Sequence, residues 1–233
     1  ANIREQCSWV HAHQHEKATK KAKDIVRMAV AKAAWLNPQE EPELEVKDTA
    51  LVIGRGIAGM TASLTLADQG FKVHLVEKEP ELGGMLRKIY KLYPTDEEAS
   101  KILEASINAV MNHNNINTLT STNIKSVDGY IGNFEVTALK NGEEKKFKAG
   151  TVIIATGAVE FKPVGLFGYD KYGQVLTQVD LEKVLQSGKS NMDKFFKPQR
   201  VAMIQCVGAR EEKPPRTYCS RICCMVAVKN AML

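Results

Sequence analysis

The sequence has no long uninterrupted run of apolar residues and few aromatic side chains. Its 233 residues are 44% hydrophobic and 6% aromatic, and no apolar segment reaches the roughly 20 residues that a membrane-spanning helix requires. Basic residues are scattered and are not interleaved with aromatic ones, as they are on many nucleic-acid-binding surfaces. We therefore expect neither a membrane span nor a nucleic-acid partner, in spite of the net charge of +5.

Cysteine is nearly absent from the first 200 residues. Only Cys7 lies there, whereas Cys206, Cys219, Cys223 and Cys224 are close together near the end. The N-terminal residues are polar and charged, which is not the pattern of an export signal. Clustered cysteines without secretory features are typical of metal centres in a reducing compartment. We therefore expect a cytoplasmic protein with a metal centre rather than disulfides.

A glycine-rich turn is the strongest single motif in the sequence. Residues 50–53 predict a buried parallel strand, and Gly54, Gly56 and Gly59 form a G-x-G-x-x-G pattern that leads into a helix. The first glycine permits a sharp turn, the second lets the backbone approach a pyrophosphate, and the third lets the helix pack on the strand. This order of strand, turn and helix predicts a dinucleotide-binding fold.

Three later features are expected to complete the same site. A second strand, residues 71–76, ends in Glu77, 23 positions after Gly54, where a carboxylate can bind ribose hydroxyls. A pair of glycines and the last parallel strand are expected to bring the backbone close to the ligand from other sides. These two features are Gly83-Gly84 and residues 151–158, which include Ala155-Thr156-Gly157.

Between these features, the sequence predicts one helix and a β-rich insertion. The helix covers residues 96–112, with Asp96 as its N-cap. Turns are predicted at Asp128-Gly129 and Asn141-Gly142. The expected strands are 116–119, 124–127, 134–139 and 145–149. The predicted class is α/β: a Rossmann-like three-layer domain with a β-rich insertion.

A helical segment is predicted to precede this domain. Apolar residues at helical spacing indicate a helix over about residues 15–36. His11, His13 and His15 alternate, but no cysteine or carboxylate is placed to complete a metal site, so solvated histidines are favoured. Cys7 is either a buried packing residue or a ligand or redox group. The predicted domains are 1–48 (helical segment and linker), 49–198 (FAD-binding) and 199–233 (the start of a second dinucleotide-like domain).

The second domain is expected to open with a strand over residues 201–205, but no second glycine-rich turn follows. Four cysteines lie there instead, Cys206, Cys219, Cys223 and Cys224. Thiolates bind zinc or iron–sulfur clusters, and adjacent cysteines can point to different corners of a cubane. A [4Fe-4S] cluster is therefore favoured, with zinc and a redox-active Cys223–Cys224 pair as alternatives. Basic residues that would offset its charge are Arg210, Lys213, Arg216 and Arg221.

Two resemblances extend this interpretation. The glycine motifs, Glu77 and Ala-Thr-Gly together resemble the FAD-binding half of thioredoxin-reductase-like flavoproteins, which favours FAD over NAD. Four stretches that span nearly the whole chain resemble the A-type subunits of heterodisulfide reductase, a family of flavin and iron–sulfur proteins of anaerobic energy metabolism, methanogenesis included. These stretches are residues 2–11, 52–62, 129–134 and 206–225.

The second resemblance implies an oxidoreductase subunit that is active only within a complex. Its FAD would exchange electrons with iron–sulfur clusters and, in many such complexes, split an electron pair between two acceptors. The implied partners are other heterodisulfide-reductase-type subunits and electron donors linked to hydrogenase or formate dehydrogenase. No side chain is expected to be catalytic in itself. The expected FAD contacts are Gly54, Gly56, Ile57, Ala58, Gly59, Glu77, Lys78, Gly83, Gly84, Met85, Ile124, Ala155, Thr156 and Gly157, and Arg87 could also neutralise charge.

The sequence departs from the family pattern in two places. Residues 96–101 contain no cysteine where family members commonly have several, and no ferredoxin-like insertion follows Lys140. We therefore expect one flavin and one cluster, in a reduced paralogue or one half of a split subunit. Because the chain stops within an apolar helix, a second polypeptide or a missing segment is expected to complete the fold. The rival functions are a pyridine-nucleotide dithiol oxidoreductase and a non-catalytic assembly subunit.

Overall fold

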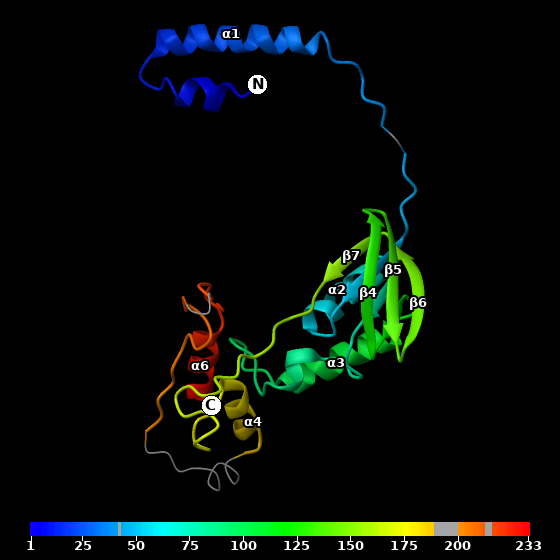
Figure 1. Ribbon diagram of the computed structural model, residues 1–233, viewed down its shortest axis with the longest axis vertical. Coiled ribbons are helices and arrows are strands. Elements are labelled where there is room, and N and C mark those ends of the chain that lie inside the picture. The colour runs from blue at the N-terminus through cyan, green and yellow to red at the C-terminus, as the bar shows by residue number, and fades with distance from the viewer. Residues whose placement is uncertain (42, 189–199, 213–215) are drawn as a thin grey trace. The chain divides into compact units, whose positions relative to one another are not determined.

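The computed structural model describes residues 1–41, 43–188, 200–212 and 216–233, which form two compact units, Ala1–Leu44 and Glu45–Leu233 (Figure 1). The first unit contains a short π-helix, η1 (Arg4–Trp9), and α1 (His15–Ala33). The Cys7 thiol is buried and donates a hydrogen bond to the Ala18 carbonyl at 2.8 Å. The predicted N-terminal helix is confirmed, and the Cys7 side chain packs inside this unit.

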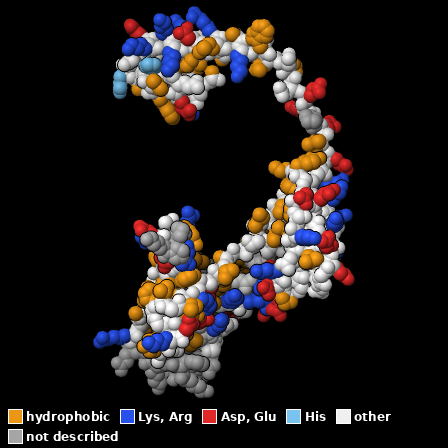
Figure 2. Space-filling model, in the orientation of Figure 1, with side chains coloured by type: hydrophobic (Ala, Val, Ile, Leu, Met, Phe, Trp, Pro, Cys, Tyr) orange, Lys and Arg blue, Asp and Glu red, His pale blue; other side chains and the backbone are white. Residues whose placement is uncertain are grey.

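The surface of the first unit is mixed in character. Figure 2 shows hydrophobic side chains together with Lys and Arg side chains over this unit. Val26, Met28 and Val30 of α1 are all exposed, whereas Ile25 is buried. None of the helices that the structure describes is long and apolar enough to cross a membrane.

The second unit is built on a parallel sheet with the strand order β3-β2-β1-β7. Its strands are β1 (Thr49–Ile53), β2 (Lys72–Val76), β3 (Ile116–Leu119) and β7 (Thr151–Ile154). Parallel sheets are covered on both faces, so their strands are apolar at consecutive positions. This explains why the short apolar runs of the sequence predicted the strands correctly.

Alternate residues of β1 point into two different cores. On one face, Val52 and Leu75 pack with Met60 of α2 (Ile57–Asp68) and Leu103 of α3 (Ala99–Asn112). On the other face, Leu51 packs against an antiparallel sheet. That sheet has the order β4-β5-β6, with β4 (Thr122–Tyr130), β5 (Asn133–Lys140) and β6 (Glu143–Ala149). The predicted α/β class with a β-rich insertion is thus confirmed.

Two predicted details of this region are wrong. The reversal between β4 and β5 is not at Asp128-Gly129, because pairing continues to Tyr130 opposite Asn133. Gly129 is instead a strand position with a positive φ of 100°. The N-cap position of α3 is occupied by Glu98 rather than Asp96, and the Glu98 side chain makes no capping hydrogen bond with the described residues. Asp96 has a φ of 60° in the preceding turn, where its carboxylate pairs with Lys91 at 3.0 Å. The turn at Asn141-Gly142 is confirmed.

Among the described residues after β7, two helices lie beside each other (Figure 1). They are α4 (Gln178–Gln186) and α6 (Cys223–Met232). The strand predicted over residues 201–205 is absent from the described structure, in which the parallel sheet ends at β7. The part of the predicted FAD-binding domain over residues 189–198 lies outside the described residues. The proposed domain boundaries remain a prediction.

The buried core provides a direct test of this fold. Leu75 is completely buried, so Leu75→Ala should lower the free energy of unfolding by about 2–5 kcal/mol through lost burial and a cavity. The surface control, Ile131→Ala, changes a side chain that is 87% exposed and should alter it by less than about 0.5 kcal/mol. Urea unfolding followed by circular dichroism measures both, and equal effects would contradict this packing.

Candidate dinucleotide and thiol sites

The turn after β1 is closed by contacts that leave no room for a side chain. Gly54 has a φ of 119°, and a Cβ atom built on it would lie 2.2 Å from the Ala155 carbonyl oxygen. A Cβ on Gly59 would lie 1.9 Å from the Gly54 carbonyl oxygen. The first and third glycines are therefore needed for the fold itself, because backbone atoms of β1, α2 and the end of β7 occupy these positions.

The second glycine has a different role. Gly56 is the N-cap of α2 and has a φ of −71°, and no side chain caps this helix by a hydrogen bond. A Cβ atom on Gly56 would meet nothing within 4 Å. The backbone around Gly56 therefore faces open space at a helix N-terminus, where unpaired N–H groups and the helix dipole favour a phosphate.

Glu77 is fixed beside this turn by backbone hydrogen bonds. Its side chain is 8% exposed, and its two oxygens accept the N–H groups of Arg55 and Glu79, each at 2.9 Å. The Arg55 Nε atom also lies 3.9 Å from the carboxylate. A carboxylate can accept about four hydrogen bonds, so Glu77 keeps capacity for ribose hydroxyls.

The paired glycines form a second wall of the site. Gly83 and Gly84 both have positive φ, and a Cβ on Gly84 would lie 3.1 Å from the Gly56 Cα atom. A 3₁₀ helix, η2 (Gly84–Arg87), follows. Arg87 pairs with Glu81 at 3.1 Å, so its charge is already partly neutralised by the protein.

The third wall follows β7. The Ala155 N–H donates to the Ile53 carbonyl at 2.7 Å, which brings Ala155 against the glycine turn. The next residues, Thr156 and Gly157, are exposed. The ends of β1 and β7 therefore meet at the carboxyl edge of the sheet, where ligands of α/β folds bind.

Three predicted contacts have different surroundings. Met85 is 37% exposed on η2, and Lys78 is exposed after Glu77. Ile124 pairs with Ala138 in the antiparallel sheet and packs in the second core. The structure brings the glycines, Glu77 and the end of β7 together, whereas Ile124 serves the packing of the insertion.

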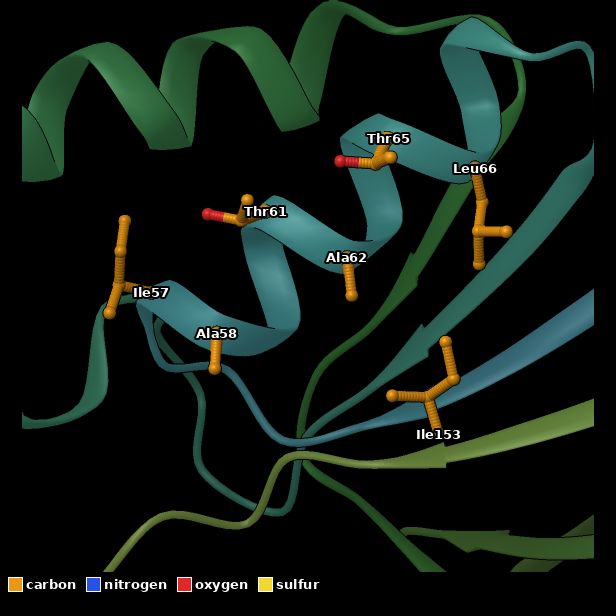
Figure 3. Close-up of a pocket in the computed structure, with 7 residues that line it drawn as sticks. All are labelled: Ile57, Ala58, Thr61, Ala62, Thr65, Leu66 and Ile153. Carbon is orange, nitrogen blue, oxygen red and sulfur yellow. The ribbon is translucent and has the colours of Figure 1, made fainter.

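An open apolar groove lies beside the turn, between α2 and β7 (Figure 3). The α2 residues Ile57 and Ala58, both predicted FAD contacts, lie at one end of it, and Ile153 of β7 forms its other side. Ile154, the last residue of β7, is 75% exposed. The remaining lining residues are Thr61, Ala62, Thr65 and Leu66.

Neighbouring groups shift the pKa values of the two adjacent cysteines, Cys223 and Cys224. The Ser220 hydroxyl and the backbone of Cys206 hydrogen-bond to Cys223 and hold the pKa of its thiol below the ordinary value. The pKa of the Cys224 thiol is raised above its ordinary value. The main causes are its hydrogen bond with Cys223 and the charge of Cys223, and burial and the charges of Cys206 and Cys219 contribute less. Cys223 and Cys224 begin α6. Cys224 thus interacts electrostatically with the other three predicted thiol ligands.

Unusual backbone and side-chain contacts surround the thiols. Cys206 has a φ of 61°, and Gly208 lies against the Phe161 ring, which a Cβ would approach to 2.4 Å. The Arg216 guanidinium stacks on the same ring at 4.5 Å and pairs with Glu211 at 3.4 Å. This packing holds the loop that carries Cys206.

Two nitrogen atoms near these thiols in the sequence are buried without a partner. Among the described residues, Gln205 Nε2 and Arg216 Nε make no hydrogen bond. Unpaired buried donors are rare in folded proteins. Among all the residues that the structure describes, no three His, Cys, Asp or Glu side chains are close enough together to hold a metal ion.

Comparison with protein families decides the wider relationship. The pyridine nucleotide-disulphide oxidoreductase family matches residues 48–208, more than half of the chain. The chain belongs to this family. Its α/β domain is accordingly a Rossmann-like, FAD-binding domain of an oxidoreductase, in agreement with the geometry of the glycine turn.

Named relatives point in the same direction. One is the iron-sulfur A 1 subunit of the CoB–CoM heterodisulfide reductase of Methanopyrus kandleri, 36% identical over 321 aligned positions that cover 100% of this chain and 48% of that protein. Another is the A subunit of the H2:CoB-CoM heterodisulfide,ferredoxin reductase of Methanothermobacter marburgensis, 35% identical over 317 positions with the same coverage of 100% and 48%. The chain is thus homologous to the A-type subunits of heterodisulfide reductase and spans about half the length of these curated relatives.

One solved structure is similar to part of this chain. It is the thioredoxin reductase of T. acidophilum, which is 19% identical to this chain with a TM-score of 0.43. The similarity covers 55% of this chain and 42% of the reductase.

Gly56 separates ligand binding from folding. Gly56→Ala should leave the thermal unfolding midpoint unchanged, because its Cβ atom meets open space. The same methyl group would occupy the position of the pyrophosphate, so FAD affinity should fall at least ~10-fold, or about 1.4 kcal/mol. Titration of the flavin-free protein with FAD, followed by flavin fluorescence, measures this change.

Gly173→Ala is the matched control, since a Cβ atom at Gly173 also meets no described residue within 4 Å. Gly173 is more than 100 positions from the glycine turn in the sequence. Its FAD affinity should equal that of the wild type. An unchanged affinity in Gly56→Ala as well would place the pyrophosphate elsewhere.

Proposed function

We propose that this chain is a flavin and iron–sulfur electron-transfer subunit of a heterodisulfide-reductase-type complex. In this proposal it passes electrons between FAD and a [4Fe-4S] cluster. One observation carries the proposal: the glycine turn of the FAD-binding fold and all four clustered cysteines belong to the same compact unit, Glu45–Leu233.

The FAD would be held mainly by backbone groups. The N–H groups at Gly56 and the start of α2 would bind the pyrophosphate, and Glu77 would accept hydrogen bonds from the adenosine ribose. Gly83, Gly84 and the segment after β7 let the backbone lie close to the ligand on both sides. The bound flavin supplies one- and two-electron chemistry, and the protein positions it.

We propose that the four clustered cysteines bind an iron–sulfur cluster, although no three of the described His, Cys, Asp or Glu side chains are grouped to hold a metal ion. Thiolates are its usual ligands, and N–H donors to its sulfurs raise its reduction potential. Gln205 and Arg216 each have a buried nitrogen without a partner among the described residues, as expected where a group rich in acceptor atoms would bind. Cys206, Cys219, Cys223 and Cys224 would hold the cluster at the start of the predicted second domain, residues 199–233.

The open apolar groove between α2 and β7 is a candidate binding surface for a further polypeptide segment. Parallel sheets are normally covered on both faces, yet the groove beside Ile57 and Ile153 is apolar and open. We propose that a second polypeptide, or a further segment of a longer chain, covers it and completes the flavin site. Activity then requires the assembled complex.

The relatives suggest the class of partner. Their names include H2, formate and ferredoxin, together with the CoB–CoM heterodisulfide. Analogous subunits and hydrogenase- or formate dehydrogenase-linked donors are therefore the proposed partners, and division of an electron pair between two acceptors is the proposed overall process. We propose that this complex is cytoplasmic, because clustered cysteines without secretory features are typical of metal centres in a reducing compartment.

The relay in this chain would be shorter than in those relatives. The alignment with the M. kandleri protein has 321 positions, and this chain has 233 residues, which leaves about 88 positions without a counterpart here. This excess agrees with the missing ferredoxin-like insertion after Lys140. We propose one flavin and one cluster.

Anaerobic metal analysis tests the proposal. The purified wild-type complex should contain about four more iron and four more acid-labile sulfide atoms per chain than the complex that carries Cys223→Ser, and after dithionite reduction it should give the EPR signal of one additional cubane cluster. Cys223→Ser should lose that signal because it removes one ligand. Cys7→Ser is the control, since Cys7 lies in the other compact unit, and should keep it.

Two other results would overturn the cluster. Stoichiometric zinc would make the thiols a structural metal site. Absence of metal, with two thiols lost on oxidation, would favour a dithiol flavoenzyme at Cys223 and Cys224. A cluster that exchanges no electrons with the flavin would favour the non-catalytic assembly subunit.

A further inference from the structure

A buried ion pair links the two helices that follow the parallel sheet. Lys229 of α6 contacts the carboxylate of Glu182 on α4, and these side chains are only 7% and 1% exposed. Removing two charges from water is costly and is tolerated only when the remaining donors and acceptors are also satisfied. The other contacts of this pair therefore show what it holds in place.

Both partners also bind the backbone of a third segment. The second oxygen of Glu182 accepts the Tyr90 N–H at 2.8 Å, and Lys229 Nζ donates to the Lys91 carbonyl at 2.8 Å. One ion pair thus joins α4, α6 and residues 90–91. Each of these bonds has a defined direction, so a slide of α6 along its axis would break them.

Residues 90–91 are themselves tied to the dinucleotide turn. They follow η2, which begins at Gly84 in close contact with Gly56. The Tyr90 carbonyl accepts the N–H of Ala99, the first residue of α3. The segment is therefore anchored to the same elements that form the nucleotide site.

The same ion pair is linked to the thiols through helix α6, which contains both Lys229 and Cys223. Lys229 lies six positions after Cys223 in the same helix. Asn230, the next residue, donates to the Gln178 side chain at 2.8 Å, which holds α6 against α4 a second time. Because a helix is rigid over this length, fixing Lys229 also fixes Cys223 and Cys224 in its first turn.

We propose that Glu182 and Lys229 are positioning residues that set the distance and orientation of Cys223 and Cys224 relative to the dinucleotide turn. This inference rests on the proposed function. It adds that the flavin-to-cluster geometry depends on one buried ion pair, remote in sequence from the glycine turn. Apolar side chains of similar volume would fill the same space without specifying one register of α6.

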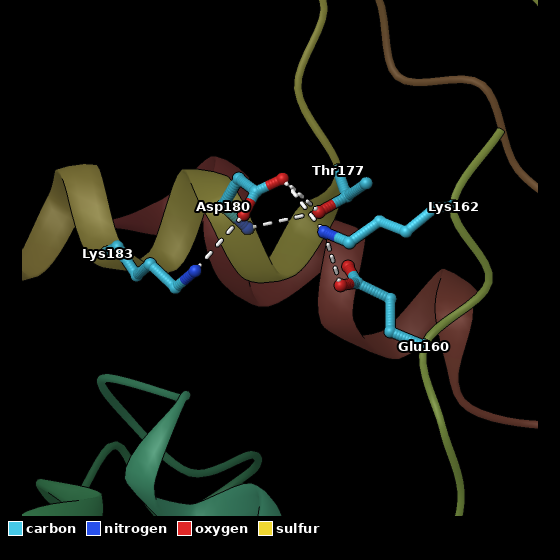
Figure 4. A network of polar contacts seen from close by, with 5 residues as sticks. All are labelled: Glu160, Lys162, Thr177, Asp180 and Lys183. Carbon is cyan, nitrogen blue, oxygen red and sulfur yellow. Dashed lines mark hydrogen bonds and ion pairs between the residues drawn. The ribbon is translucent and has the colours of Figure 1, made fainter. Parts of the chain in front are cut away.

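A second ion-pair network on α4 supplies a matched control (Figure 4). Lys162 Nζ contacts Asp180 at 3.1 Å and Glu160 at 2.8 Å, and its side chain is 43% exposed. The Thr177 hydroxyl donates to the Asp180 carboxylate at 2.9 Å. Lys162→Met removes an ion pair from the same helix while leaving the bonds of Glu182 and Lys229 in place.

The test uses the full-length protein in its native complex. The double variant Glu182→Met/Lys229→Met removes both charges together, so no unpaired charge stays buried. It should keep the FAD and iron content of the wild type. Stopped-flow measurements should show flavin-to-cluster electron transfer slowed at least tenfold at unchanged KM for the electron donor, and the cluster EPR line shape should change. Lys162→Met should match the wild type in both measurements.

Glu182→Gln is the milder variant if the double variant loses its cofactors. It keeps the acceptor for Tyr90 but weakens the contact with Lys229, and a smaller slowing in the same direction is expected. Normal cofactor content with an unchanged rate and EPR signal in either variant would overturn the positioning role.

Failure of the proposed function gives a distinguishable result. If the wild-type complex contains no more iron than the Cys223→Ser complex, the cluster is wrong, and the positioning inference is tested by alkylation of Cys223 and Cys224 with iodoacetamide. The double variant should then react at least threefold faster than both wild type and Lys162→Met. Equal rates would overturn the inference.

Discussion

The close contact of three backbone segments around the glycine turn determines much of this structure. Gly59 packs on the Gly54 carbonyl, and Gly54 packs on the Ala155 carbonyl, at distances that no Cβ atom can occupy. These contacts join β1, α2 and the end of β7. They also leave the backbone at Gly56 facing open space, so the contacts that make the fold also make the phosphate site.

Much of this could be predicted from local sequence patterns. Glycine spacing and short apolar runs have local causes, which is why the turn after β1 and the positions of the four parallel strands were predicted correctly. The N-cap at Asp96 and the turn at Asp128-Gly129 were wrong, because tertiary pairing of the neighbouring strands and turns overrides the preference of one or two residues.

Contacts between distant segments could not be predicted in the same way. Glu182 and Lys229 are 47 positions apart, and each looks like an ordinary charged residue of an exposed helix. The only available signal was the apolar character of α6 around Lys229. The interaction of Cys206 and Cys219 with the start of α6 agrees with their clustering in the sequence. Which group they bind remains a proposal.

The central claim is that this chain places FAD and a [4Fe-4S] cluster in one electron-transfer path. An anaerobic structure of the native complex tests it most directly. We predict an FAD pyrophosphate at the backbone of Gly56 and a cubane bound by Cys206, Cys219, Cys223 and Cys224. A zinc ion at these cysteines, or a disulfide between Cys223 and Cys224 with no cluster, would contradict the claim.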